Sequence, residues 1–92
     1  MTDLRIVPTS RFTKDLKRLR KRGYDLDLLG RVVDALALRQ QLDSKYRDHA
    51  LTGNFHNCRE CRITPDWLLI YEIDDDELIL YLTRTGNHSD LF

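Results

Sequence analysis

Apolar and polar residues are arranged along the chain in a pattern that predicts one strand, two helices and then several strands. Residues 4–7 (Leu-Arg-Ile-Val) form a short apolar run that predicts a strand ending at Pro8. Thr9 or Ser10 is placed to cap the helix that follows, and Gly23 ends this helix.

Both predicted helices carry an apolar stripe at intervals of three and four residues. The second helix begins near Asp25 or Asp27. The apolar positions are Phe12, Leu16 and Leu19 in the first helix, and Leu28, Leu29, Val32, Val33, Leu36 and Leu42 in the second. Two consecutive helices of this kind form a hairpin whose apolar side must cover a sheet.

The second half of the chain is rich in strands, which we expect at residues 58–64, 67–73 and 77–83. Pro65-Asp66 predicts a tight turn, and residues 74–76 (Asp-Asp-Asp) predict another. The last two strands are continuously apolar, which indicates central positions in the sheet. The sequence thus predicts an α+β fold with the order β-α-α-β-β-β, in which the helical hairpin packs on one face of a mainly antiparallel sheet.

Length and composition favour one folded domain spanning residues 1–92. Hydrophobic residues make up 41% of the chain and charged residues 33%, as is typical of globular proteins rather than disordered ones. The apolar runs fall well short of the roughly 20 residues that span a bilayer, and the first residues lack the apolar region of a signal peptide. We therefore expect a cytoplasmic protein without a membrane partner.

A net charge of zero hides a strong division between the two halves of the chain. Residues 1–50 carry 12 basic and 7 acidic side chains, whereas residues 51–92 carry 3 basic and 8 acidic ones. Seven basic residues fall between Arg11 and Arg22, with Asp15 as the one acid among them. This helix is either an ordinary solvated face or a contact for a polyanion. The candidate RNA-binding residues are Lys14, Lys17, Arg18 and Lys21.

Two features raise the question of a metal site. Cys58 and Cys61 form a single CxxC pair, but a zinc site needs about four ligands and no second pair follows. The acidic run 72–77 is better explained as a solvated hairpin turn. We expect two unpaired thiols, no metal and no cofactor.

Polar residues near the strand ends suggest a reaction at one end of the sheet. Alternation places Glu60 and Arg62 on one face of their strand, Asp66 lies in the following turn, and His49 and His88 flank the strands. Imidazoles exchange protons near neutral pH, and arginines bind phosphate. This set suits RNA cleavage without a metal, with Phe92 or Tyr71 stacking on a base. The alternative is that these histidines are structural.

Three segments resemble a known family. They are residues 46–53 (Tyr-Arg-Asp-His-Ala-Leu-Thr-Gly), residues 59–71 with their Pro-Asp-Trp turn, and residues 84–92 (Arg-Thr-Gly-Asn-His-Ser-Asp-Leu-Phe). In combination they are similar to the YafQ type of the RelE toxin superfamily, and the resemblance spans nearly the whole chain.

The resemblance implies the toxin of a bacterial type II toxin–antitoxin pair, acting as a ribosome-dependent mRNA endonuclease. Such toxins enter the A site of the 70S ribosome and cleave mRNA through attack by the 2′-hydroxyl group. A cognate proteic antitoxin holds them inactive. From the charge division we expect the basic first helix to contact ribosomal RNA in that site. The residues matching the family's active-site positions are His49, Glu60, Asp66, His88 and Phe92, with Arg84 as the phosphate contact and His88 as the main acid or base.

Position 62 departs from the family pattern, because Arg62 stands where YafQ-like proteins commonly carry histidine. Arginine does not exchange protons at neutral pH, although it can stabilise a phosphorane. Arg62 therefore leaves open a weakened homologue that only binds antitoxin. A separate alternative is a ParE-like toxin that shares the fold and binds DNA gyrase. His56 matches no active-site position and is expected at the surface.

Overall fold

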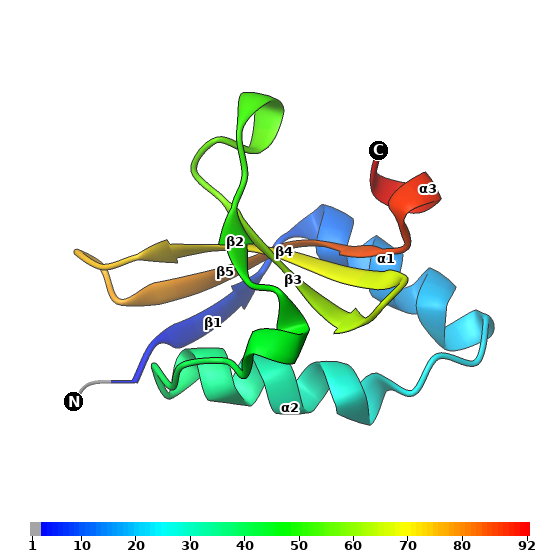
Figure 1. Cartoon of the computed structure of the whole chain (residues 1–92), viewed down its shortest axis with the longest axis horizontal. Helices are drawn as coiled ribbons and strands as arrows, with labels where there is room; N and C mark the ends of the chain where they lie inside the picture. Colours follow the sequence, from blue (N-terminus) through cyan, green and yellow to red (C-terminus); the bar gives the residue numbers. More distant parts are fainter. Residues whose placement is uncertain (1–2) are drawn as a thin grey trace.

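The computed structural model describes residues 3–92, and Figure 1 shows its elements in chain order. They are β1 (Arg5–Pro8), α1 (Ser10–Lys21), α2 (Leu26–Ala37), the 3₁₀ turn η1 (Ser44–Tyr46), β2 (His49–Ala50), the 3₁₀ turn η2 (Gly53–Phe55), β3 (Arg59–Thr64), β4 (Trp67–Asp74), β5 (Ile79–Gly86) and α3 (His88–Leu91).

The strands form one sheet in the order β1-β5-β4-β3-β2. β1 runs parallel to β5, and the other three pairs are antiparallel. The prediction of a mainly antiparallel sheet is confirmed, as is the central position of the two apolar strands, now β4 and β5. β1 lies at one edge of the sheet, next to β5, so α1, which follows β1, and α3, which follows β5, both contact β5.

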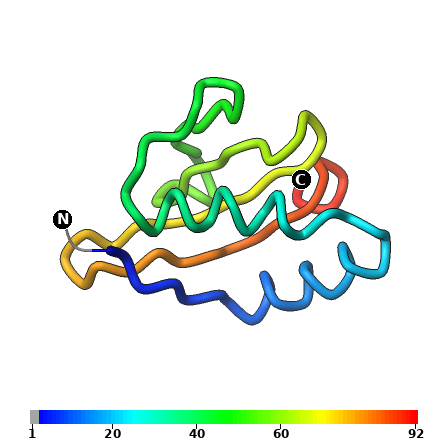
Figure 2. The backbone as a smooth tube through the Cα atoms, turned by 90° about the horizontal axis from the view of Figure 1, so that it is seen from below, coloured from blue at the N-terminus to red at the C-terminus, as the bar shows by residue number. Residues whose placement is uncertain are grey.

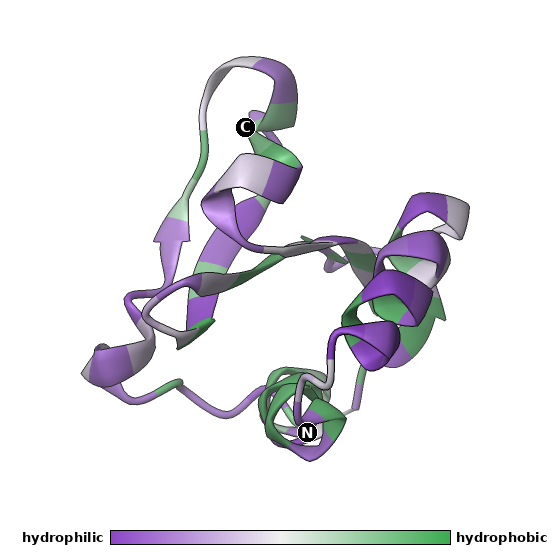
Figure 3. Ribbon diagram, turned by 90° about the vertical axis from the view of Figure 1, so that its right-hand side faces the viewer, coloured by the Kyte–Doolittle hydropathy of each residue, from purple (hydrophilic) through white to green (hydrophobic). Residues whose placement is uncertain are grey.

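Helices α1 and α2 pack on one face of the sheet, as Figures 2 and 3 show from below and from the side. Thr9 caps α1 by accepting a hydrogen bond from the backbone N–H of Phe12 at 3.1 Å, and Asp25 caps α2. Gly23 adopts a positive φ of 80°, which lets the chain turn sharply between the helices. The predicted hairpin is confirmed, and its stripe residues lie with the helix-facing side chains of β3, β4 and β5 in one hydrophobic core.

Four details differ from the sequence prediction. Helix α2 ends at Ala37, so Leu42 lies beyond it, although Leu42 still packs against the core. The last strand starts at Ile79 because Leu78 has a positive φ of 57°, and it continues to Gly86. His49 and Ala50 form an additional short strand, β2, which pairs antiparallel with β3. The apolar pattern did not predict its position, because both its residues are exposed. The short helix α3 was also missed.

The opposite face of the sheet is covered only in part, by α3 and the segment around η2 (Figure 3). A small second cluster lies there, in which Leu91 of α3 and Cys58 pack against Leu68 and Ile70 of β4. Cys61 points into the main core instead, so the two cysteines occupy opposite faces as free, buried thiols. Within residues 3–92, no helix has the length and apolar character needed to cross a membrane.

Candidate active site on the open face

A row of side chains crosses the sheet on the face that α1 and α2 leave uncovered. His49 of β2 lies opposite Glu60 of β3, Glu60 opposite Ile70 of β4, and Ile70 opposite Arg84 of β5. Residues directly opposite each other share a face, and neighbouring strands lie about 4.8 Å apart. Register thus brings three predicted site residues into one line.

His49 and Glu60 form the first imidazole–carboxylate pair, with 3.6 Å between Nε2 and Oε1. The Nδ1–H of His49 donates to the carbonyl oxygen of Arg47 at 2.6 Å, because a carbonyl can only accept. This bond directs Nε2 toward the Glu60 carboxylate, which is 5% exposed. His49 itself is half-exposed and therefore accessible to a ligand.

The segment that carries His49 is held by its neighbour Asp48. The Asp48 carboxylate accepts two hydrogen bonds from Arg59, both at 3.3 Å, and one from the hydroxyl of Tyr71 at 2.5 Å. Burial and the neighbouring Asp48 carboxylate raise the pKa of Tyr71. Tyr71 is 1% exposed, so the expectation that it stacks on a base is wrong: its ring belongs to the core.

His88 and Asp66 form the second pair, with 3.7 Å between Nδ1 and Oδ1. Asp66 lies in the turn between β3 and β4, and His88 is the first residue of α3. Both side chains are exposed. The predicted convergence of the turn with the segment after the last strand is confirmed.

Phe92 completes this end of the site. Its ring lies 6.4 Å from the imidazole of His88 and 6.0 Å, edge to face, from Phe55 of η2. At 65% exposed it presents a large aromatic surface. Such a ring next to an imidazole provides a stacking platform for a base.

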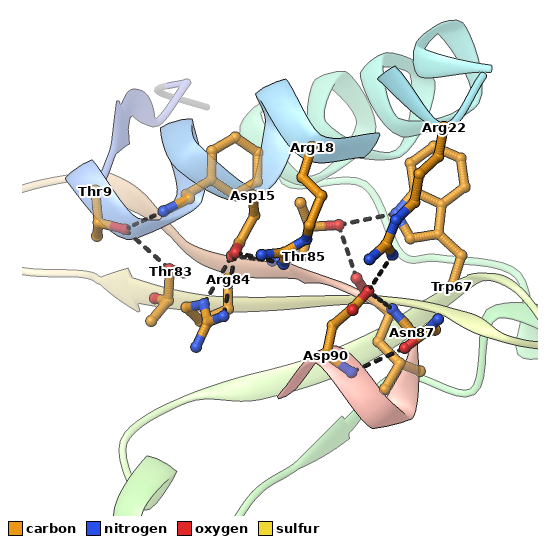
Figure 4. A network of polar contacts seen from close by, with 12 residues as sticks. Thr9, Asp15, Arg18, Arg22, Trp67, Thr83, Arg84, Thr85, Asn87 and Asp90 are labelled. Carbon is orange, nitrogen blue, oxygen red and sulfur yellow. Dashed lines mark hydrogen bonds and ion pairs between the residues drawn. The ribbon is translucent and has the colours of Figure 1, made fainter. Parts of the chain in front are cut away.

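Arg84 is held by a carboxylate that the sequence analysis did not assign to the site. Asp15 of α1 accepts hydrogen bonds from Nε of Arg84 at 2.7 Å and from Nη2 at 3.1 Å (Figure 4). This pair raises the pKa of Arg84. Nη1 is left as the guanidinium nitrogen not bonded to Asp15.

Arg62 lies on β3, two residues after Glu60, and borders a separate groove. This groove of about 590 Å³ lies between α2, η1 and the β3–β4 turn and is also bordered by Lys45, Tyr46 and Arg47. Its Nε is buried and has no hydrogen-bond partner among the described residues. The groove extends to Thr64 and Pro65, the two residues before Asp66 in the turn.

The basic side of α1 is divided between solvent and the protein. Lys14, Lys17 and Lys21 are exposed, whereas Arg18 is partly buried and donates to Asp15 at 2.9 Å.

His56 is exposed, as expected. The acidic residues 74–77 form the predicted turn, in which the Asp74 carboxylate accepts from the backbone N–H groups of Asp76 and Glu77. Residues 3–92 contain no group of three or more His, Cys, Asp or Glu side chains arranged to hold a metal ion.

Comparison with known proteins places this arrangement in context. The family model described as "Bacterial toxin of type II toxin-antitoxin system, YafQ" matches residues 4–92. The mRNA interferase toxin YafQ of Escherichia coli K12 is 34% identical over 85 residues, covering 91% of this chain and 90% of that protein.

Solved structures agree in fold. A metal-bound toxin from Helicobacter pylori is 49% identical, with a TM-score of 0.91 over 97% of this chain and 99% of that one. The toxin in the E. coli DinJ-YafQ toxin-antitoxin complex is 33% identical, with a TM-score of 0.89 over 98% of each chain. With the family model matching from β1 to the last residue, the chain belongs to the YafQ family of bacterial type II toxin–antitoxin toxins.

Proposed function

We propose that this toxin is an endoribonuclease that cleaves mRNA in the A site of the translating ribosome. The observation that carries the proposal is the pair of imidazole–carboxylate couples, His49–Glu60 and His88–Asp66, on the face of the sheet that also carries Arg84. The E. coli relative is named an mRNA interferase, which supports this class of reaction.

The proposed reaction needs two proton transfers and no metal. The 2′-oxygen attacks the neighbouring phosphorus while its proton passes to a base, and the bond from phosphorus to the 5′-oxygen breaks as that oxygen receives a proton. His88, exposed beside Phe92, is the main acid or base, and Asp66 orients it. His49, oriented by the Arg47 carbonyl and Glu60, assists.

Arginines balance the negative charge that develops on the phosphorane oxygens. Arg84 supplies a guanidinium held in a fixed direction by Asp15. Arg62 supplies a second cation at the other side of the Asp66 turn. Phe92 stacks against a base next to the cleaved bond.

Two macromolecular partners follow from this proposal. The exposed lysines of α1 contact ribosomal RNA, where phosphate contacts position the toxin without reading sequence. A cognate antitoxin protein inhibits it, as supported by the DinJ-YafQ complexes of the E. coli relative. Since the proposed target is the ribosome, the proposed place of action is the bacterial cytoplasm.

The experiment is a cleavage assay with purified toxin and 70S ribosomes programmed with a defined mRNA, read by primer extension. Wild type cuts in the A-site codon, and His88→Ala loses at least about 100-fold in rate, because general acid–base catalysis contributes on that order. His56→Ala is the matched control and cuts like wild type. Absence of cutting by the wild type, or full cutting by His88→Ala, contradicts the proposal.

The same assay distinguishes the two alternatives. A ParE-like toxin leaves mRNA intact and inhibits purified DNA gyrase in a supercoiling assay. A weakened homologue leaves mRNA intact until Arg62→His restores a histidine at this position. Under our proposal Arg62→Gln lowers the rate about 10- to 100-fold by removing one charge that stabilises the phosphorane.

A further inference from the structure

Helix α1 reaches into the proposed site through an acid buried in an otherwise basic surface. Asp15 is 2% exposed. Besides the two bonds from Arg84, its carboxylate accepts one from Nη2 of Arg18 at 2.9 Å and one from the backbone N–H of Thr85 at 3.2 Å. Four donors around one buried carboxylate fix both the acid and the two-pronged guanidinium of Arg84 (Figure 4).

Arg22, which caps the C-terminal end of α1, makes a second ion pair between this helix end and the proposed site. Arg22 donates from Nη1 to Oδ2 of Asp90 in α3 at 2.9 Å. The Asp90 carboxylate also accepts from the backbone N–H of Asn87 at 3.0 Å, and the Asn87 side chain accepts from the backbone N–H of Asp90 at 2.8 Å. This reciprocal cap closes the first turn of α3, whose first residue is His88.

A four-residue helix does not hold its shape alone, because its hydrogen bonds do not repay the cost of ordering it. The direction of His88 therefore depends on the cap and on how the cap is docked. Gly86 shows how tight that docking is: a Cβ added there would lie 2.9 Å from both Cβ and Oδ2 of Asp90. Asp90 is thus wedged between the end of β5 and the guanidinium of Arg22.

We propose that Asp15 and Asp90 are positioning residues for RNA cleavage, with Asp15 fixing Arg84 and Asp90 fixing His88 against helix α1. This inference rests on the proposed function, since it assigns these two carboxylates to that same reaction. Helix α1 then acts as a rigid support that keeps the guanidinium of Arg84 and the imidazole of His88 at a fixed distance and orientation. Neither carboxylate needs to touch the RNA.

The inference predicts the kinetic signature of positioning. Asp15→Asn keeps the shape of the side chain but removes its charge, so Arg84 loses its fixed direction. We expect kcat to fall about tenfold or more with little change in KM, since misplacement of a group that acts in the transition state lowers kcat. Asp90→Asn should do the same through His88. Asp34→Asn, an exposed acid on α2, is the matched control and leaves both constants unchanged.

Double-variant cycles separate positioning from general stability. If Asp15 acts through Arg84, Asp15→Asn combined with Arg84→Gln is no slower than Arg84→Gln alone. The same holds for Asp90→Asn with His88→Ala. Circular dichroism checks that each variant is folded at the assay temperature. If Asp15→Asn does not fold, the cycle of Asp90→Asn with His88→Ala tests the inference, because Asp90 is more exposed than Asp15.

The outcomes are distinct. Losses that multiply in both cycles, or single variants that cut at the wild-type rate, overturn the positioning roles while leaving the proposed nuclease intact. A wild-type protein that does not cut mRNA overturns the proposed function, and the positioning roles with it.

Discussion

At the scale of single residues, Thr85 near the end of β5 links this strand to the start of β4. Its hydroxyl accepts a hydrogen bond from the indole N–H of Trp67 at 2.9 Å and donates to the carbonyl of Leu68 at 2.8 Å. Both Trp67 and Thr85 are buried. The bond lets a tryptophan lie in the core without leaving its one polar atom unsatisfied.

Replacing this hydroxyl tests that account. Thr85→Val keeps the shape but leaves the indole N–H of Trp67 without its partner and removes the bond to the Leu68 carbonyl, so we expect a loss of about 1–3 kcal/mol in the free energy of unfolding. Thr13→Val on the exposed side of α1 is the control, with a change within about 0.5 kcal/mol. Guanidinium titrations measure both, and equal effects would contradict the role of the buried bond.

The two thiols give a second residue-scale prediction. Burial raises the pKa of Cys61 to about 12, and burial also raises that of Cys58. Since the thiolate is the reactive form, native protein at pH 8 should react slowly with iodoacetamide at both positions. Mass spectrometry should show rapid double labelling only in denaturant; fast labelling of native Cys61 would contradict its burial.

At the scale of elements, α1 combines three functions on three sides. Phe12 and Leu19 pack in the core, Asp15 and the capping residue Arg22 at the helix end bind groups of the proposed site, and exposed lysines face solvent. The same helix therefore links the predicted ribosome contact to the proposed cleavage site.

Charge reversal tests the ribosome contact. The double variant Lys14→Glu/Lys17→Glu should weaken ribosome binding by tenfold or more at low salt, and the difference should shrink as salt rises, because lysine–phosphate attraction is screened. Arg5→Glu/Arg31→Glu makes the same charge change at exposed positions outside α1 and should bind more tightly than the α1 variant. Co-sedimentation across a salt series measures both, and equal weakening would show a nonspecific charge effect.

Helix α3 should be sensitive to acid. Burial acts to raise the pKa of Asp90, but hydrogen bonds from Arg22 and Asn87 outweigh it, so the pKa is lowered. A lowered folded-state pKa gives stability that is present above the unfolded value, about 3.9, and is lost as pH falls through the folded value. NMR shifts of residues 88–92 should therefore change as the pH drops below about 4. In Asp90→Asn the change should be smaller, because the carboxyl group of the cap is gone.

At the scale of the whole molecule, one continuous core lies between the two helices and strands β3, β4 and β5. We predict a single cooperative unfolding transition for residues 1–92. Trp67, 2% exposed, reports tertiary packing by fluorescence, while circular dichroism reports the helices. The two probes should give the same midpoint in guanidinium, and separate midpoints would indicate more than one folding unit.

The charge division also has a clear meaning at this scale. The basic half supplies α1, and the acidic excess gathers largely in the β4–β5 turn, where it is solvated. Arg39 of the first half pairs with Asp75 of this turn at 2.8 Å. A zero net charge thus coexists with a strongly basic helix surface, so the total charge says little about partners.

The sequence alone determined the two long helices, the four longer strands and the residues of much of the proposed site, but not β2 or α3. Helical stripes, capping residues and the continuously apolar β4 and β5 are local signals, because backbone geometry repeats over a few residues. The residues of the two imidazole–carboxylate pairs were also identified, through their motifs and their places at strand ends.

Only the tertiary structure decided which side chains meet and which are hidden. Asp15 and Arg84 are 69 residues apart in sequence, and Arg22 and Asp90 are 68 apart. Such contacts arise because β1 pairs with β5, the last strand, which places α1 against it. Tyr71 appeared available for RNA but is buried, since exposure depends on how layers pack. Local sequence sets the period of each element, whereas partners and burial follow from packing between elements far apart in the chain.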